Sequence, residues 1–335
     1  MIDHPLSGIC ALHPDWPEAR FNISGLFVYD RLVLYFLDLV QNGYACRVPI
    51  EAVHGAPSVR WNGGRIMPVA FRPAELDARL AEIYSRNVGC FLTFTNHLLE
   101  ARDLSDPLCN FLLDHVACRP DLNAVLVSSD LLSKYIAARY PALRQVASIT
   151  KVVREGGRGN AAYYRELGKR FFRYVVHPDD SADLRLLDQL DRDKTEILVN
   201  ENCARDCPQR ARHMDLIAEE QKICADNPSA GWEMASGDEL PAPLRRVAEE
   251  VARLDCSVTP LEKQVNQGLR NCNLTRTELK SIYEMGFRYF KLQGRKDVVH
   301  LLVYDLVRFT MEPEQVAPLV FKVMCKMVNA VLMRR

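Results

Sequence analysis

Eight short apolar segments, each followed by a stretch with apolar residues at helical spacing, constrain the fold of this chain more than any other feature. The apolar segments cover residues 21–27, 47–53, 89–95, 123–127, 144–149, 173–176, 197–199 and 287–292. Runs of this length bounded by turn residues are typical of buried strands. Strands that alternate with helices predict a parallel sheet, and a count of eight predicts an α/β fold that closes into a (βα)8 barrel, or TIM barrel.

Local signals place several of the predicted helices. Asp106 before Pro107 is typical of a helix start, and Thr275 with Glu278 matches the capping-box pattern. Gly286 is expected to end the helix that the capping box begins. Further helices are predicted over residues 30–41, 73–86, 131–139, 161–170, 181–190 and 298–309, and through His213 and Ile223.

The length of 335 residues suits one barrel, which typically needs about 250 residues, with additions. We expect an N-terminal lead-in at 1–20 and a barrel over 21–310 that includes an insertion at 226–270. The insertion precedes the eighth strand and carries one helix near 244–254. An extra amphipathic C-terminal helix is expected within 311–335.

Charge and cysteine content restrict the classes of function. Lys and Arg total 43, as do Asp and Glu, so the chain carries no general electrostatic signal for nucleic acid. No secretion signal and no uninterrupted apolar run long enough to span a membrane are present, so we expect a cytoplasmic protein without a membrane span. Eleven cysteines, an odd number, favour reduced thiols and metal ligation over a disulfide framework.

The segment from Thr195 to Asp215, TEILVNENCARDCPQRARHMD, combines a buried strand with two closely spaced thiols. Cys203 and Cys207 follow the strand, and a tight turn between them would let both sulfurs bind one metal centre. The alternative is a pair of ordinary reduced cysteines that act as small apolar side chains.

More ligands are needed to complete a metal site. Cys256 and Cys272 precede the eighth strand, which neighbours the seventh in a closed barrel, so four sulfurs are expected to converge there. Cys224 is the substitute for Cys256 or Cys272. Four thiolates suit an iron–sulfur cluster or zinc, and His213 would allow a mixed zinc site.

In such a barrel the active site lies at the carboxyl ends of the strands, and polar residues follow the predicted strands at these positions. The alternative for each of them is that it caps or solvates a loop. His177 with its neighbouring carboxylates is a candidate acid/base group, Lys151 a candidate Schiff-base amine, and Arg295 a candidate anchor for an anionic group. The predicted catalytic residues are His177, Asp179, Glu201, Lys291 and Arg295. The predicted substrate-binding residues are Asn96, His97, Ser128, Lys151, Asn200 and Gln293.

Two stretches carry a resemblance to a known family. NENCARDCPQR at 200–210 and GFRYFKLQGR at 286–295 resemble the collagenase-like peptidase family, peptidase family U thirty-two. The resemblance implies a barrel that in several members holds an oxygen-sensitive [4Fe–4S] cluster on four cysteines. Cys203 and Cys207 match the family's close cysteine pair, and Lys291, Gly294 and Arg295 match its final strand motif. Relatives include oxygen-independent hydroxylation proteins of ubiquinone biosynthesis and of RNA.

These observations predict an iron–sulfur barrel enzyme, an oxidoreductase or hydroxylase, that modifies a small or tethered anionic substrate. One alternative is a peptidase or hydrolase that uses His177, Asp179 and Glu201. Another is a non-catalytic subunit in a homo- or hetero-oligomer, because a C-terminal apolar stripe would either dock a partner helix or pack on the core. The stripe consists of Val316, Leu319, Val320, Val323, Met324, Met327 and Val331.

Overall fold

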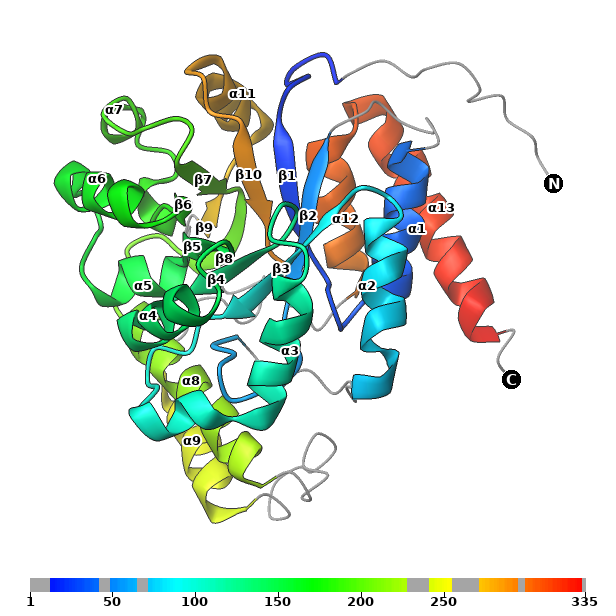
Figure 1. Ribbon diagram of the computed structural model, residues 1–335. Coiled ribbons are helices and arrows are strands. Elements are labelled where there is room, and N and C mark those ends of the chain that lie inside the picture. The colour runs from blue at the N-terminus through cyan, green and yellow to red at the C-terminus, as the bar shows by residue number, and fades with distance from the viewer. Residues whose placement is uncertain are drawn as a thin grey trace.

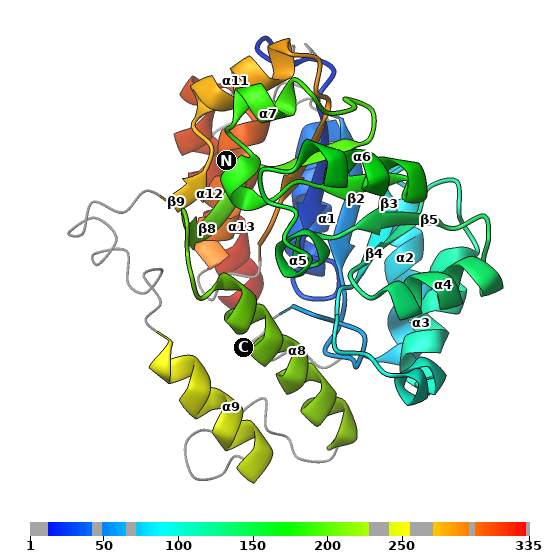
Figure 2. The same ribbon diagram turned by 90° about the vertical axis from the view of Figure 1, so that its left-hand side faces the viewer.

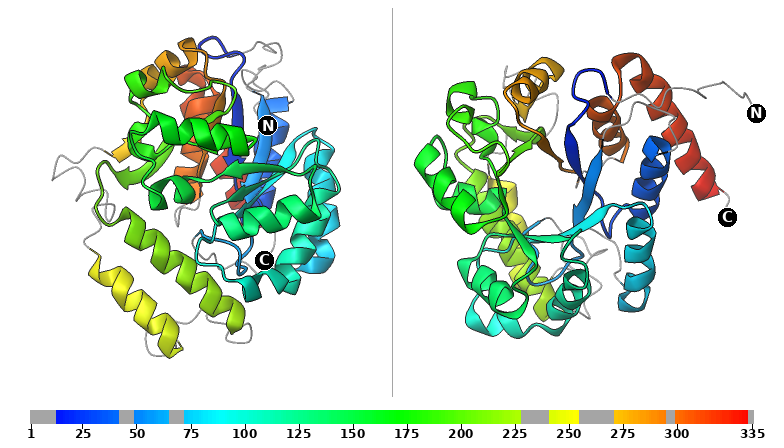
Figure 3. Two further views of the ribbon diagram at one scale, coloured as in Figure 1. Left: turned by 60° about the vertical axis from the view of Figure 1, so that its left-hand side comes forward. Right: turned by 45° about the horizontal axis from the view of Figure 1, so that its top comes forward.

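Eight parallel strands form a closed barrel in this computed structural model, as the alternating pattern predicts (Figure 1). The strands follow one another around the barrel in the order β1-β10-β7-β6-β5-β4-β3-β2. The two views in Figure 3 show helices on the outside of the strands. This closed arrangement confirms the predicted (βα)8 barrel. The structure describes residues 13–41, 49–64, 72–227, 241–254, 271–294 and 299–332.

The barrel strands lie close to the predicted positions. They are β1 (Arg20–Ser24), β2 (Ile50–Gly55), β3 (Gly89–Phe94), β4 (Ala124–Val127), β5 (Arg144–Ala147), β6 (Arg173–Val175), β7 (Thr195–Leu198) and β10 (Tyr289–Leu292). Closure is direct, because β1 pairs with both β2 and β10. The seventh and last strands are neighbours, since Phe290 of β10 lies in register with Ile197 of β7.

Helices connect and cover these strands. The α-helices are α1 (Asp30–Gln41), α2 (Leu76–Tyr84), α3 (Pro107–Ala117), α4 (Asp130–Arg139), α5 (Ile149–Arg154), α6 (Ala161–Arg170), α7 (Leu184–Leu187), α8 (Arg210–Asp226), α9 (Ala242–Arg253), α11 (Arg276–Glu284), α12 (Val299–Thr310) and α13 (Pro313–Leu332). Three 3₁₀ helices are η1 (Pro73–Glu75), η2 (Ala101–Ser105) and η3 (Pro178–Asp180).

The predicted helix starts at Asp106 and Thr275 are confirmed. Asp106 accepts a hydrogen bond from the backbone N–H of Cys109, and both bonds of the Thr275–Glu278 capping box are present. Gly286 follows α11 with φ of 100°, a left-handed conformation that favours glycine.

Three predicted elements were wrong in detail. The first strand ends at Ser24 rather than at residue 27. The fifth strand ends at Ala147 rather than at residue 149, because the Ser148 side chain caps the short helix α5. The helix expected over 181–190 is the single turn α7, whose N-cap is Asp183. In the last two cases a local side chain-to-backbone hydrogen bond sets the first residue of the helix, which apolar spacing alone does not locate.

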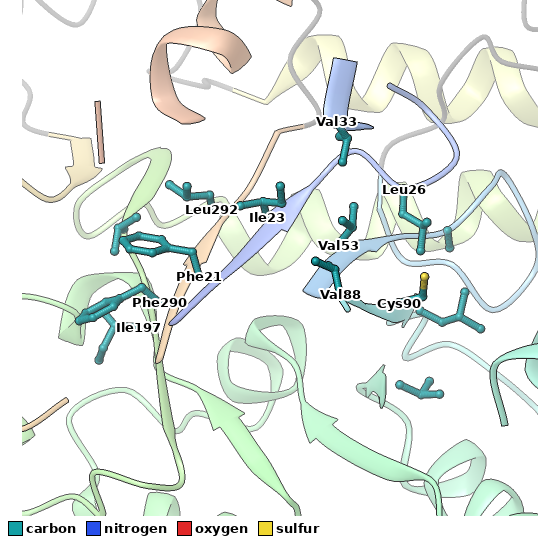
Figure 4. Packing of buried hydrophobic residues seen from close by; sticks show 14 of the residues in the cluster. Phe21, Ile23, Leu26, Val33, Val53, Val88, Cys90, Ile197, Phe290 and Leu292 are labelled. Carbon is teal, nitrogen blue, oxygen red and sulfur yellow. The ribbon is translucent and has the colours of Figure 1, made fainter. Parts of the chain in front are cut away.

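The core has two layers separated by the barrel wall. Outward-facing strand residues such as Phe21, Ile23 and Phe290 pack with the surrounding helices, and Val33 of α1 joins them (Figure 4). Inward-facing residues form a second, smaller cluster inside the barrel. That cluster consists of Ala52, Phe91, Ala124, Leu126, Val146, Val175 and Leu198. The alternation of strand side chains between two buried layers explains why these strands are apolar on both faces.

A buried polar group accompanies this inner apolar cluster. Asn22 of β1 donates from Nδ2 to Oε1 of Glu196 at 3.1 Å, and its Oδ1 lies 2.9 Å from Nδ1 of His54. Burial raises the pKa of Glu196, while the charge of Lys291 opposes this rise. The Glu196 carboxyl inside the barrel is therefore stabilised by a hydrogen bond from the Asn22 side-chain amide and by the nearby Lys291 ammonium group.

An excursion from the barrel separates β7 from α11 and β10. It begins with β8 (Asn200–Ala204), which pairs antiparallel with β9 (Asn271–Asn273). Between them, α8 and α9 lie side by side and extend away from the barrel (Figure 2). The excursion thus already begins at residue 200, whereas the predicted insertion covers 226–270. Residues 228–240 and 255–270 of that range lie outside the described residues.

Segments at both ends of the described chain also pack on the barrel. The indole of Trp16 is fully buried and donates from Nε1 to the carbonyl of Phe309 at 3.0 Å. On α13, Val316, Val320 and Met324 pack against the core. Of the two alternatives for the C-terminal stripe, these three residues follow packing on the core rather than docking of a partner helix. Within the described residues, we find no helix with the length and apolar character needed to cross a bilayer.

Candidate functional site

Three cysteines lie where the excursion leaves the barrel and returns to it. Cys203 is on β8, Cys272 is on the paired strand β9, and Cys207 follows the turn after β8. The predicted tight turn between Cys203 and Cys207 is present, and Asp206 within it has a left-handed φ of 55°. The antiparallel pairing of β8 and β9 therefore brings together thiols that are almost seventy residues apart in sequence.

Arg210 occupies the centre of this group. Its Nε lies 3.4 Å from Sγ of Cys203, and its Nη2 lies 3.6 Å from Sγ of Cys272. The same guanidinium donates two hydrogen bonds to Asp179, at 2.8 Å and 2.9 Å. The Arg210 guanidinium thus contacts both strands of the antiparallel pair β8–β9, and also the 3₁₀ helix η3 that follows β6.

Asp179 contacts several parts of the site. Besides Arg210, it accepts from the backbone N–H of Asp206 at 3.3 Å and from Sγ of Cys272 at 3.2 Å. Arg158 lies within ion-pair distance, at 3.4 Å. Burial works to raise the pKa of Asp179, but the bonds and charge of Arg210 hold that pKa well below its usual range. Asp179 is therefore an ionised anchor for the turn that carries Cys207.

The neighbouring titratable groups are strongly affected by burial. Burial raises the pKa of the Cys203 thiol to about 12, and the charges of Glu201 and Cys207 act in the same direction. Burial also raises the pKa of Cys272, where the Asp179 carboxylate adds to the effect. Burial and the charge of Arg210 lower the pKa of His177 to about 4, so its imidazole is neutral near pH 7.

Glu201, Asn200 and Gln293 link β8 to the end of β10. Glu201 accepts from the backbone N–H of Cys203 at 2.9 Å and from Nε2 of Gln293 at 3.0 Å. The Asn200 side chain exchanges hydrogen bonds with the backbone of Gln293, at 2.7 Å and 2.8 Å, and also donates to Asp305. These three predicted residues lie together beside the thiols and support the strand that carries Cys203.

Asn96 and His97 lie at the end of β3, where they contact α8. Asn96 donates from Nδ2 to the carbonyl oxygens of Arg60 and Ala218, and Nε2 of His97 lies 2.7 Å from Oδ1 of Asp215. Because Ala218 and Asp215 belong to α8, these two predicted substrate-binding residues attach α8 to the barrel.

Ser128 and Lys151 are bound to other parts of the protein. The Ser128 hydroxyl lies 2.5 Å from that of Ser148. The Lys151 ammonium is buried and pairs with Asp130 at 2.8 Å and Glu155 at 2.6 Å. Lys151 lies in α5 and not at a strand end, because Ser148 starts a helix there. These two ion pairs occupy the Lys151 amine, so a role as a Schiff-base nucleophile would require both of them to break.

Four further predicted residues are Lys291, Arg295, Cys256 and the substitute ligand Cys224. Lys291 is buried on β10, where its charge acts on Glu196 inside the barrel. Arg295 and Cys256 lie outside the described residues. Cys224 is near the far end of α8, fourteen residues after Arg210, or about 21 Å along the helix axis at the usual rise. It is therefore too distant to substitute for a sulfur ligand near Cys203.

Two thiols and the Arg210 guanidinium converge where β8 pairs with β9. Within the described part of the chain, no group of three or more His, Cys, Asp or Glu side chains is arranged to hold a metal ion. Sequence reasoning assigned no role to Arg210, although it is the last residue of NENCARDCPQR. The sequence signal that could have identified Arg210 is its position at the start of the helix that follows the thiol pair.

Comparisons with known proteins give one structural likeness. The protein is similar to a solved structure described as that of the U32 peptidase Mk0906, with a TM-score of 0.50 and 12% sequence identity. The match covers 87% of this chain and 95% of that chain, and at this identity it shows a shared fold. No protein-family model and no curated protein matches the sequence.

Proposed function

We propose that this protein is an iron–sulfur barrel enzyme that carries out oxygen-independent hydroxylation, or a related redox modification, of a small or tethered anionic substrate. The observation that supports this proposal is the approach of Cys203 and Cys272 to one guanidinium group, from two separate strands. Thiolates are the usual ligands of iron–sulfur clusters. The resemblance of residues 200–210 and 286–295 to a family with such clusters points the same way.

In this proposal Cys203, Cys207, Cys272 and Cys256 hold a [4Fe–4S] cluster. A bound cluster would supply electron transfer next to the barrel mouth. Asp179 and Arg210 position the two thiol-bearing strands, and Glu201 connects Cys203 to Gln293 at the end of β10. Zinc is the alternative metal, because four thiolates also suit a structural zinc site.

The substrate would bind at the carboxyl ends of the strands, with Lys291 and Arg295 providing positive charge for its anionic group. Reduced thiols and an oxygen-sensitive cluster require a reducing compartment, which is consistent with a cytoplasmic location.

The test is anaerobic purification followed by measurement of iron, acid-labile sulfide and zinc. We expect iron and sulfide in the wild-type protein and their loss in Cys203→Ser and in Cys272→Ser. Cys118→Ser is the matched control, because Cys118 is an exposed thiol at the end of α3, and it should retain iron. Protein that contains neither iron nor sulfide would refute the proposal, and stoichiometric zinc would replace it with a structural metal site.

A second candidate is a peptidase, because the similar solved structure is that of a U32 peptidase. His177, Asp179 and Glu201 would then provide acid/base groups. Peptide cleavage by metal-free protein that is abolished in His177→Ala would support it. Equal cleavage by wild type and His177→Ala would reject this role of His177.

A further inference from the structure

Three buried polar side chains from different strands form a hydrogen-bonded chain inside the barrel. They are Glu196 of β7, Asn22 of β1 and His54 of β2, and we call them the interior triad. Their exposed fractions are 1%, 2% and 6%. Oε2 of Glu196 has no hydrogen-bond partner among the described residues, which is costly for a buried carboxyl group. The interior of such a barrel is normally filled with apolar side chains, so packing alone does not account for the triad.

The hydrogen bonds of the triad have a fixed direction. Asn22 donates from Nδ2 to Glu196, so its Oδ1 is the atom that faces His54. A carbonyl oxygen can only accept, and the 2.9 Å bond is therefore donated by Nδ1–H of His54. A neutral imidazole with its proton on Nδ1 carries its basic lone pair on Nε2. The triad thus selects the tautomer in which Nε2 is the basic atom.

His54 lies near the end of the barrel at which this fold builds its active sites. It is followed in β2 by Gly55 alone. Ala52 belongs to the inner cluster, and residues two apart on a strand face the same side, so His54 also faces the interior. Asn22 pairs with Ala52 and therefore lies one layer deeper in the barrel. Because Nδ1 faces Asn22, Nε2 on the other side of the ring faces the carboxyl ends of the strands.

A positive charge lies beside the triad. Lys291 of β10 is the register partner of Asn22, and its ammonium charge acts on Glu196. Lys291 is also the residue to which the proposed function assigns the anionic group of the substrate. A substrate bound there would lie next to the layer that contains His54, and the positive charge would favour a substrate oxygen that becomes negative.

We propose that His54 is a general base whose Nε2 accepts the proton of a substrate hydroxyl group, and that Asn22 and Glu196 are positioning residues that hold its imidazole in the required tautomer. The inference rests on the proposed function only for the placement of the substrate at the carboxyl ends of the strands. In this step the O–H bond of the substrate breaks, the proton moves to Nε2, and the bonding electron pair stays on the oxygen. The resulting imidazolium still donates from Nδ1 to Asn22, so the bond that orients the ring is kept throughout.

The first experiment measures whether a small reagent in solution reacts with Nε2 of His54 in the wild-type protein. Diethyl pyrocarbonate acylates unprotonated imidazole nitrogen, and peptide mass spectrometry gives the rate at each histidine. His115, whose side chain is 27% exposed, is the reactive reference, and the fully buried His13 is the unreactive one. We expect His54 to be acylated at a rate comparable to that of His115. If His54 stays unmodified like His13, no substrate reaches Nε2 and the inference is overturned.

The second experiment determines the tautomer by nitrogen NMR of protein labelled at histidine, and it needs no substrate. We expect the Nδ1–H tautomer of His54 in the wild-type protein and in Asn22→Asp, whose carboxylate also accepts from Nδ1. Asn22→Leu offers no acceptor and should lose this single tautomer. Glu196→Leu should give a mixture of tautomers, because the Asn22 amide can then turn over. As a control for the fold, His115 donates from Nδ1 to the Phe111 carbonyl and should keep its tautomer in all variants.

The outcomes separate this inference from the proposed function. An Nε2–H tautomer of His54 in the wild-type protein would overturn the inference, and an unchanged tautomer in Asn22→Leu would overturn the positioning role of Asn22. If Asn22→Leu does not fold, the wild-type tautomer and the acylation of His54 still decide. Wild-type protein without iron whose His54 shows the expected tautomer and acylation would refute the proposed function and leave the general base intact.

Discussion

Arg210 and Asp179 form a buried ion pair with two hydrogen bonds, from Nη1 to Oδ2 at 2.8 Å and from Nη2 to Oδ1 at 2.9 Å. Arg210→Met would leave the Asp179 carboxylate buried without its main partner. We expect the free energy of unfolding to fall by about 3–5 kcal/mol, which is the usual cost of breaking such a pair. Urea denaturation measures this change.

A double-mutant cycle isolates the pair. Arg210→Met combined with Asp179→Asn should be less destabilised than the sum of the two single variants, because no unpaired charge remains. Arg212→Met, which removes a half-exposed arginine from the same helix, should change stability by less than about 1 kcal/mol. Additive single effects would contradict the proposed coupling between Arg210 and Asp179.

His13 should make stability depend on pH. Burial lowers the pKa of its imidazole to about 4, whereas an unfolded chain has a histidine pKa of about 6.5. The unfolded state then binds more protons between these values, so stability should be full above about pH 6.5 and fall towards about pH 4. The loss should reach up to about 3 kcal/mol. In His13→Gln, urea unfolding should show a weaker dependence over this range, and an unchanged slope would argue against a buried neutral ring.

Gly294 follows β10 at a point where no side chain fits. A Cβ atom added there would clash with Oγ of Ser24 and with Cδ1 of Leu302. Gly294→Ala should therefore lower stability by about 1–3 kcal/mol through overpacking. Gly168→Ala is the control, because its nearest contact is 3.4 Å and it lies inside α6, where alanine favours the helix. A thermal melt in which both variants behave alike would refute the steric argument.

Asn96 should control how firmly α8 is held on the barrel. Asn96→Ala removes the hydrogen bonds to the carbonyls of Arg60 and Ala218. Protection of α8 amides in hydrogen exchange should then drop by about 1–3 kcal/mol, while α11 stays protected. Asn227→Ala, which removes a bond to Ile223 at the last turn of α8, should affect that turn alone. Uniform loss of protection across the barrel would instead indicate global destabilisation.

Much of the architecture could be predicted because its causes are local. A buried strand needs an apolar run, and Asp106 and Thr275 mark helix starts through bonds within three residues of themselves. Ser148 could not be recognised in this way, because its cap competed with an apolar run that continues to Ile149. Lys151 was consequently expected at a strand end, and the structure places it in α5 between two carboxylates.

By itself, the sequence determined that eight strands alternate with helices and that Cys203 and Cys207 follow the seventh strand, because periodicity and turn residues act over short distances. Only the tertiary structure decided that β9 returns to pair with β8, which places Cys272 beside Cys203. It also decided that Arg210 and Asp179 meet between these thiols. The physical reason is that long-range strand pairing and buried ion pairs depend on what the whole fold brings into contact, and no short pattern in the chain encodes that contact.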